Sequence, residues 1–405
     1  SRPCGRWPVK RPPDLPSVER ARAIAFVLFA ASAAGGLAVF VLYPLWTLLA
    51  ALLSRPRRSR LPGSGAPPPE PTVSLLVAAR NARDLVEAKV RNTLGLAYPA
   101  DRLDLVFVSD GSRDDTAARV RPFVGPRVRF VELPEHRGKA AALNEGFART
   151  RGEIVVFSDV DALLAPDAVG RLVRHFADPA VGGVCGRRVI GEPGEELREA
   201  QSLYVSLDGA LKRAESRLGR ITSNDGKIHA IRREAFRPIS PGATDDLFTC
   251  LSVVRQGFRF LYEPEARAFV RLPSRSADHE ISRRRRIVSR SLKGIFLARG
   301  VLNPFRYGFF AFGLFVNKVL RRLLPVFLAT LLATSAFLAP VHPWMRAILA
   351  GQLALYGLAL LHPILRRRVS GVCQYFCVGN LGTLLGLVDF LRRRETVRWE
   401  PLKAS

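Results

Sequence analysis

The apolar run from Ala23 to Leu53 restricts the fold of this chain most strongly, because it contains no charged residue. It is longer than the roughly 20 residues that an α-helix needs to cross the hydrocarbon core of a bilayer. A secretory signal peptide has a shorter apolar core and a small-residue cleavage site. Here the run ends in the basic sequence Ser54-Arg55-Pro56-Arg57-Arg58. We therefore predict a retained transmembrane anchor within residues 1–60, and a buried core helix is the alternative.

Long apolar segments return near the end of the chain, at Leu323–Leu338, Trp344–Leu361 and Val372–Leu391. Each is close to spanning length, although Gln374, Asn380 and Asp389 interrupt the last one. We predict transmembrane helices over 323–391 and a basic tail over 392–405. The preceding residues 301–322 mix aromatic and basic side chains, which is typical of a helix that lies in the membrane interface.

The formal net charge of +27 calls for an anionic partner or surface, either nucleic acid, acidic lipid or a phosphate-bearing substrate. Many basic residues directly follow apolar runs, where an anionic membrane face attracts them: Arg55, Arg57, Arg58 and Arg60, then Arg366–Arg368, then Arg392–Arg394. No zinc-finger or RNA-binding signature accompanies them, and the five cysteines show no metal-ligand spacing. Membrane lipids are therefore the expected partner, and nucleic acid is not.

Between the anchor and the late apolar segments, the sequence changes character. Residues 61–71 are rich in proline and glycine and read as a linker. Short apolar runs then alternate with polar helical segments, and these runs are Val73–Ala79, Leu105–Ser109, Val128–Val131 and Ile154–Phe157. Strands that alternate with helices indicate βαβ units. The region 72–300 is therefore predicted to be an α/β domain with a mostly parallel sheet that is buried on both faces.

Polar and acidic residues follow these strands, at the edge where open α/β sheets bind ligands. Asp110-Gly111-Ser112 comes after the second run, and Ser158-Asp159-Val160-Asp161 comes after the fourth. At strand spacing Asp159 and Asp161 point to the same side and can share Mg²⁺ or Mn²⁺. Such a cation could neutralise a diphosphate leaving group. The alternative is a pair of turn or helix-capping aspartates.

Five motifs in order resemble glycosyltransferase family 2. They are Val73-Ser-Leu-Leu-Val-Ala-Ala-Arg-Asn81, Val108-Ser-Asp-Gly-Ser112, His136-Arg-Gly-Lys-Ala140, Ser158-Asp-Val-Asp161 and Thr244-Asp-Asp-Leu247. The anchor and the late apolar segments are similar to the membrane synthases related to cellulose, hyaluronan and poly-N-acetylglucosamine synthases. The resemblance implies a Rossmann-like GT-A fold and an inverting, metal-dependent transfer from a nucleotide sugar, expected to be a UDP-sugar, to a growing glycan. It also implies an integral protein of a bacterial inner or plasma membrane with a cytoplasmic catalytic domain.

The resemblance also implies roles for individual residues. Asp246 would be the catalytic base that takes the proton of the acceptor hydroxyl, while Asp159 and Asp161 would hold the metal. The other expected contacts are Ala79, Arg80, Asp110, Lys139, Asp159, Arg286 and Arg290 for the donor, and Asn224, Asp225 and Asp245 for the acceptor side. A helix N-terminus, which favours acidic residues, is a second explanation for Asp245-Asp246.

The chain departs from the pattern of processive relatives, which carry Gln-x-x-Arg-Trp, because Ile287 and Ser291 stand at the Gln and Trp positions. Arg286 and Arg290 remain four residues apart on one helix face, suited to diphosphate, and an interfacial basic stripe is the alternative. The missing Trp removes a platform for an acceptor sugar. Single addition to a membrane lipid is therefore the alternative function. A non-catalytic scaffold is a third, which the intact aspartates disfavour.

Overall fold

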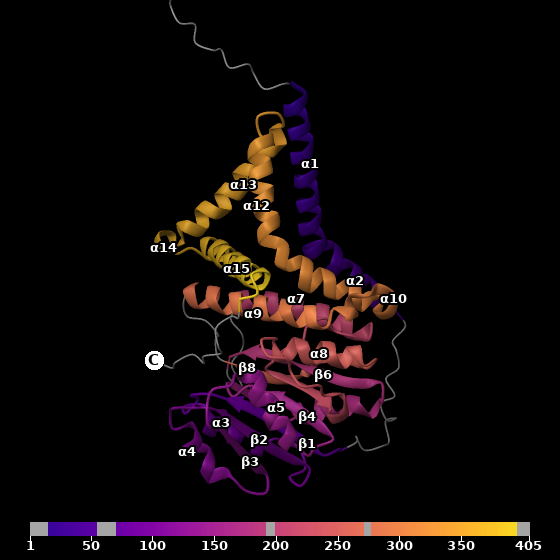
Figure 1. The fold of residues 1–405 in the computed structure, drawn as a ribbon, viewed down its shortest axis with the longest axis vertical. Helices are drawn as coiled ribbons and strands as arrows, with labels where there is room; N and C mark the ends of the chain where they lie inside the picture. Colours follow the sequence, from indigo (N-terminus) through magenta and orange to yellow (C-terminus); the bar gives the residue numbers. More distant parts are fainter. Residues whose placement is uncertain (1–14, 55–69, 192–198, 271–276, 395–405) are drawn as a thin grey trace, which may run out of the picture.

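The computed structural model describes residues 15–54, 70–191, 199–270 and 277–394. The first fourteen residues, most of the predicted linker and the tail beyond Arg394 lie outside the described residues, as do Arg55, Arg57, Arg58 and Arg60. Figure 1 shows a sheet domain beneath a group of long helices. The chain therefore separates into the α/β part and the helical part that the sequence predicts.

The sheet has the order β3-β2-β1-β4-β7-β6-β8-β5. Its first half is parallel, whereas β7 runs antiparallel to both β4 and β6, and β6 and β8 are parallel again. The strands are β1 Val73–Ala79, β2 Leu103–Asp110, β3 Val128–Leu133, β4 Ile154–Ser158, β5 Ala162–Leu164, β6 Val181–Ile190, β7 Ile228–Arg232 and β8 Arg259–Val270. The prediction of an α/β fold with a mostly parallel sheet is confirmed.

Helices cover both faces of the sheet, which explains why its strands are apolar throughout. Every residue of β1 and of β4 is buried. One face packs against α3 (Val86–Leu94), α4 (Thr116–Val120) and α6 (Ala168–Val173), while the other packs against α5 (Lys139–Arg149) and α8 (Asp245–Arg255). With both faces covered, only the loops beyond the strand ends are left to bind a ligand.

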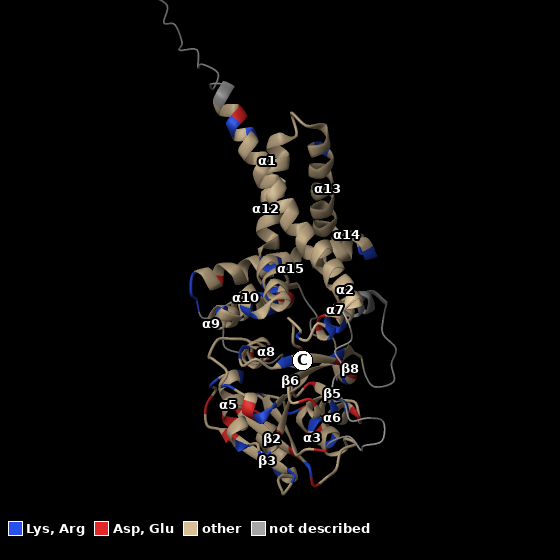
Figure 2. Cartoon of the chain, turned by 90° about the vertical axis from the view of Figure 1, so that its right-hand side faces the viewer, with Lys and Arg blue, Asp and Glu red and all other residues tan. Residues whose placement is uncertain are grey.

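Within the residues that the structure describes, three helices are long and apolar enough to cross a membrane: Ser17–Leu53, Phe309–Leu338 and Arg368–Leu391. The first consists of α1 (Leu15–Leu37), a π-helical stretch (Ala38–Leu42) and α2 (Tyr43–Leu53), and the second ends in α12 (Leu324–Leu338). In Figure 2 many charged residues lie in the sheet domain and next to it, whereas the upper helices are mostly uncharged apart from the upper end of α1 and the region of α14. The predicted integral membrane character is consistent with this distribution.

The segment from Arg299 to Leu323 is divided into several short helices. These are η5 Arg299–Leu302, α10 Pro304–Tyr307, α11 Phe309–Leu314, the π-helical η6 Phe315–Val319 and η7 Leu320–Leu323. Gly308 adopts φ +54° between α10 and α11, so the interfacial segment predicted over 301–322 is not one continuous helix. From Phe309 onwards the chain stays helical into α12, which pairs with α13 (Pro343–Leu360).

The last long helix, α15 (Arg368–Leu391), packs along α9 (Ala277–Leu297) at the base of the helical part (Figure 1). Gly379, Gly382 and Gly386 face α9, so its backbone approaches closely. Asp389 accepts a hydrogen bond from Arg285 Nη2 at 2.8 Å. This contact explains why an acidic residue interrupts an otherwise apolar segment.

A buried carboxylate connects the first membrane helix to the sheet domain. Glu215, on α7 (Glu199–Arg217), accepts hydrogen bonds from the Tyr43 hydroxyl of α2 at 2.5 Å and from the backbone N–H and the hydroxyl of Thr222. The Thr222 hydroxyl also accepts a bond from Asn317 of η6 at 3.0 Å. Two membrane-proximal segments thus converge on one point of the domain.

We predict that Tyr43→Phe lowers the free energy of unfolding by about 1–3 kcal/mol, because buried Glu215 loses a donor. The thermal unfolding midpoint in detergent measures this effect. Tyr307→Phe is the control, since its hydroxyl reaches only the Arg255 carbonyl at 3.5 Å. An unchanged midpoint for Tyr43→Phe would show that this contact does not hold the two parts together.

Candidate active site

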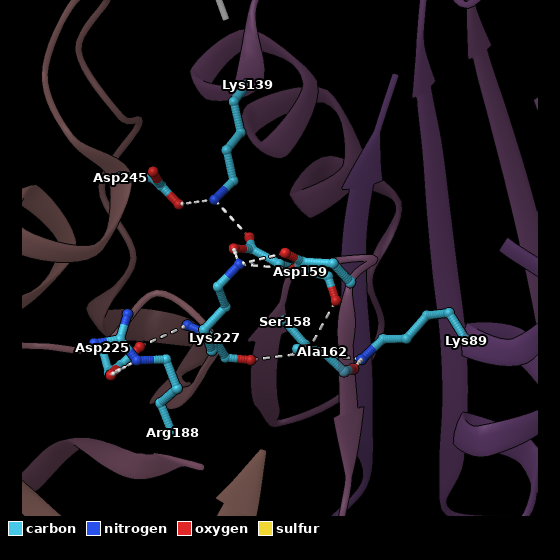
Figure 3. A network of polar contacts seen from close by, with 10 residues as sticks. Lys89, Lys139, Ser158, Asp159, Ala162, Arg188, Asp225, Lys227 and Asp245 are labelled. Atoms are coloured by element: carbon cyan, nitrogen blue, oxygen red, sulfur yellow. Dashed lines mark hydrogen bonds and ion pairs between the residues drawn. The ribbon is translucent and has the colours of Figure 1, made fainter. Parts of the chain in front are cut away.

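The aspartates that follow β4 are paired with two lysines from distant parts of the chain (Figure 3). Lys227 Nζ lies 2.9 Å from Asp159 Oδ2 and 2.7 Å from Asp161 Oδ1. Lys139 Nζ, at the start of α5, lies 2.6 Å from Asp159 Oδ1 and 2.8 Å from Asp245 Oδ2. Lys139 therefore joins the turn after β4 to the first turn of α8, and Lys227, the residue just before β7, joins the same turn to that strand.

Asp159 is half-buried, which by itself opposes its ionisation, but the charges of Lys139 and Lys227 prevail and hold its pKa well below the usual range. It is a carboxylate at neutral pH, as a cation ligand has to be. Asp159 and Asp161 lie close together, as predicted, because both contact the ammonium group of Lys227.

Lys89 supports the turn between Asp159 and Asp161 from behind, and sequence reasoning missed it. Its ammonium group is fully buried and donates to Ser158 Oγ at 2.7 Å and to the Ala162 carbonyl oxygen at 2.5 Å. Burial lowers the pKa of Lys89 to about 7, and the neighbouring carboxylates oppose that shift. A signal was present, because Lys89 lies in the apolar stripe of α3 between Val86 and Val90.

Asp110, at the end of β2, is buried and holds the loop that leads into α5. Its two oxygens accept hydrogen bonds from the backbone N–H groups of Arg137 and Gly138, and one of them also contacts His136 Nδ1 at 2.8 Å. This loop delivers Lys139 to Asp159. The structure therefore gives Asp110 a positioning role, and its contact with a nucleotide base stays a prediction.

The loop after β1 lies beside the one after β2, as expected for neighbouring parallel strands. Ala79 ends β1, and after Arg80 the Asn81 backbone N–H donates to Ser112 Oγ at 3.1 Å. Asn81 Oδ1 in turn accepts from the backbone N–H of Arg113 at 2.9 Å. Ala79 and Arg80 thus lie at the same sheet edge as Asp110.

Asp246 lies in the first turn of α8, against the loop that includes Asn224, Asp225 and Gly226. Asn224 Nδ2 donates to the Asp246 backbone oxygen at 3.1 Å, and the α-carbon of Gly226 faces the Asp246 side chain. Burial and the charge of Asp245 raise the pKa of Asp246 to about 6. A raised pKa suits a group that takes up a proton near neutral pH.

Asp245, expected on the acceptor side, contacts Lys139 instead and so faces Asp159. Asp225 stays near the acceptor loop, where its Oδ1 accepts from the Lys227 backbone N–H at 3.2 Å and its Oδ2 lies 3.7 Å from Arg188. The structure therefore brings the expected acceptor residues together in part, with Asn224 and Asp225 on one side of Asp246 and Asp245 on the other.

The basic run on α9 divides into two groups. Arg283 and Arg284 pair with Glu280 of the same helix, while Arg284 also contacts Tyr375 and Arg285 pairs with Asp389, so Arg284 and Arg285 help to dock α15. Among the described residues no ion pair engages Arg286 or Arg290, and Arg290 Nε is buried without a hydrogen bond. Arg290 also lines a cavity of about 360 Å³ beside Arg137 and Gly138. The role of Arg286 and Arg290 in binding a diphosphate stays a prediction.

The half-parallel sheet and its carboxylate-bearing edge define a GT-A domain of the nucleotide-sugar-binding class. Residues 74–239 match the model of the family "Glycosyl transferase family 2", and the chain carries a domain of that family. The family predicted from the five motifs is confirmed.

The similar proteins match either about half of this chain or nearly all of it. Poly-beta-1,6-N-acetyl-D-glucosamine synthases of Staphylococcus aureus and Staphylococcus epidermidis are 29% identical over 213 and 208 residues, which is 50% of this chain and 50% of theirs. The chain thus matches only about half the length of these curated relatives. A mannosyltransferase from Pyrobaculum calidifontis, solved with GDP-Man and Mn²⁺, is 26% identical with a TM-score of 0.68, and the similarity covers 92% of this chain and 99% of that one.

We predict that Gly111→Ala destabilises the domain by about 1–3 kcal/mol or more, through backbone strain and a clash. Gly111 has φ +57°, and an added Cβ would lie 2.4 Å from the backbone of Glu135 and His136. Gly125→Ala is the matched control, because no atom lies within 4 Å of its added Cβ. Equal unfolding midpoints for the two variants would contradict this account of the loop.

Proposed function

We propose that this protein transfers a sugar from a nucleotide-sugar donor to a growing glycan at the membrane, with inversion at the anomeric carbon. The observation that carries the proposal is the convergence of Asp159, Asp161 and Asp246 at one sheet edge, joined through Lys139 and Asp245. The family and the synthase relatives support it. A UDP-sugar is the expected donor.

The donor set at the sheet edge fits a divalent cation such as Mn²⁺ or Mg²⁺. Asp159 and Asp161 are carboxylates, and the ammonium of Lys227 already stands between them as a cation. Among the described residues no group of three or more His, Cys, Asp and Glu could enclose a metal, so water and donor phosphates would complete the coordination. When bound, the cation would neutralise charge on the diphosphate leaving group.

The chain's own residues supply the remaining steps of the proposed reaction. Asp246 would accept the proton of the acceptor hydroxyl, because it is a half-buried carboxylate beside the acceptor loop and its pKa is raised. Arg286 and Arg290 would face the diphosphate, since no carboxylate among the described residues neutralises them. Lys139 would keep Asp159 and Asp245 in register.

Transfer of a single sugar to a membrane lipid is the second candidate, and the membrane side of the site favours it. The position of the missing Trp, Ser291, accepts a hydrogen bond from Arg322 Nη2 at 2.6 Å, so an arginine stands where processive relatives carry an aromatic platform. The similarity to the mannosyltransferase covers 92% of this chain, whereas that to the synthases covers 50% of it. Product length on a gel distinguishes the two candidates.

We place the sheet domain on the cytoplasmic side, where nucleotide sugars are made. One crossing by α1 then puts the N-terminus on the far side, and α12 with α13 forms a returning pair (Figure 1). Because α15 lies along α9, the basic residues Arg392–Arg394 stay on the side of the domain. At the C-terminus this arrangement agrees with the tendency of basic residues to stay on the cytoplasmic side of a membrane. Labelling of single introduced cysteines at the two ends tests it.

We predict that Asp246→Asn lowers kcat by about 10²–10⁴ and leaves donor affinity unchanged, because the amide cannot act as a base. Wild-type turnover should also fall as the pH drops through about 6, where the Asp246 carboxylate becomes protonated. Asp161→Asn is the contrasting variant and should weaken donor binding measured by calorimetry. Near wild-type turnover of Asp246→Asn would assign the base to another residue, with Asp245 first in line.

We predict that Lys227→Gln binds Mn²⁺ several-fold more tightly than the wild type in the absence of donor. The ammonium group competes with the metal for Asp159 and Asp161, and the amide does not. Calorimetric titration with MnCl₂ measures the difference. Arg188→Gln removes a positive charge from the same network without touching either aspartate. Equal Mn²⁺ affinity in Lys227→Gln and wild type would place the metal elsewhere.

A further inference from the structure

Two cations just before α12, Lys318 and Arg322, meet only neutral partners. Lys318 Nζ donates to Ser223 Oγ at 2.7 Å, and Arg322 Nη2 donates to Ser291 Oγ at 2.6 Å. Arg322 Nη1 also donates to the Lys318 carbonyl oxygen. The Nε of Arg322 is buried and has no hydrogen bond among the described residues. Both side chains thus hold their charged ends toward hydroxyl groups.

Three other cations near the site have carboxylate partners, whereas Arg286 and Arg290, like these two, have none among the described residues. Lys139 and Lys227 have aspartate partners, and Lys212 lies 2.9 Å from Asp208. Within the described ranges no carboxylate oxygen lies within 4 Å of the Lys318 or Arg322 side chain. Both side chains are half-buried, and withdrawing unpaired charges from water is unfavourable. Two such charges side by side indicate that a ligand supplies the missing negative charge.

The pair lies where an acceptor at the membrane would reach the proposed base. Ser223 opens the loop whose next residue, Asn224, binds the Asp246 backbone, and Arg322 is close enough to Asp246 to interact electrostatically. The helix that carries the pair continues into α12. A ligand held here would therefore approach Asp246 from the side of the membrane helices.

We propose that Lys318 and Arg322 form a phosphate-binding site at the acceptor side of Asp246. A guanidinium fork, an ammonium group and two serine hydroxyls are all donors, and a phosphate offers several acceptor oxygens with one or two negative charges. The phosphate is that of a membrane lipid acceptor or that of the nucleotide diphosphate, and the location below α12 favours the lipid. This inference rests on the proposed transfer reaction, because the phosphate-bearing lipid would be the acceptor of that reaction.

The test uses the full chain in a maltoside detergent, with dodecyl phosphate as the lipid probe and UDP with Mn²⁺ as the nucleotide probe. Lys318→Gln and Arg322→Gln should each weaken dodecyl phosphate binding tenfold or more, which corresponds to about 1.4 kcal/mol. UDP binding should stay within about twofold, because UDP would be held at Asp159 and Asp161. Arg321→Gln, on the same turn, is the matched control for a general loss of positive charge and should bind dodecyl phosphate normally.

Each other outcome has a definite meaning. Loss of UDP binding with unchanged dodecyl phosphate binding would assign the phosphate site to the donor and overturn the lipid acceptor. Unchanged binding of both probes, or an equal loss in Arg321→Gln, would overturn the site itself. If a glutamine variant fails to fold, Arg322→Lys keeps the charge without the fork and should still weaken dodecyl phosphate binding. A wild type that binds no nucleotide diphosphate would contradict the proposed transfer reaction, independently of the lipid probe.

Discussion

The hydrogen bonds that Glu215 accepts from Tyr43 and Thr222 connect the membrane helices to the sheet domain, and the geometry of the site depends on them. Burial raises the pKa of Glu215, and each donor offsets part of that effect, so the carboxyl group needs its partners. Thr222 immediately precedes the loop that contacts Asp246. The distance between the membrane and the candidate base is therefore set by a small number of buried polar contacts rather than by apolar packing alone.

The sheet edge brings acidic groups together and neutralises them with lysines of its own. Parallel apolar strands end at one edge, which places Asp110 at the end of β2 and brings Asp159 together with Asp161 after β4. Mutual repulsion would follow if Lys139, Lys227 and buried Lys89 did not come from other elements to balance the charge. A cation and an anionic donor can enter such a site by exchanging partners with these lysines, at little net change in buried charge.

The domain and the membrane helices carry different parts of the function. The family-wide chemistry belongs to the sheet edge, which the synthase relatives share over half of the chain. In our proposal the acceptor is selected where Ser291, Arg322 and Lys318 lie below α12, outside the match to the family model. A common fold hosts many activities, and it is the site that distinguishes them. The two proposed activities, elongation of a glycan and modification of a lipid, therefore differ in the membrane side of the site rather than in the sheet domain.

Local sequence patterns determined the elements and the main candidate residues of this protein. The length of the first apolar run predicted the anchor, and the alternation of strands with helices predicted the α/β domain. The spacing of residues along the sequence placed Asp159 with Asp161 and Arg286 with Arg290, because residues two apart in a strand or four apart in a helix lie on the same face. Tertiary structure alone decided the partners: Lys227 is 66 residues from Asp161, Lys89 is 69 from Ser158, and Arg285 is 104 from Asp389. It also turned Asp110 toward its own loop, Asp245 toward Lys139, and α15 onto α9. The physical reason is that the spacing of residue types along the sequence shows which face of a helix or strand a side chain occupies, whereas the charge partner of that side chain depends on how separate elements pack together.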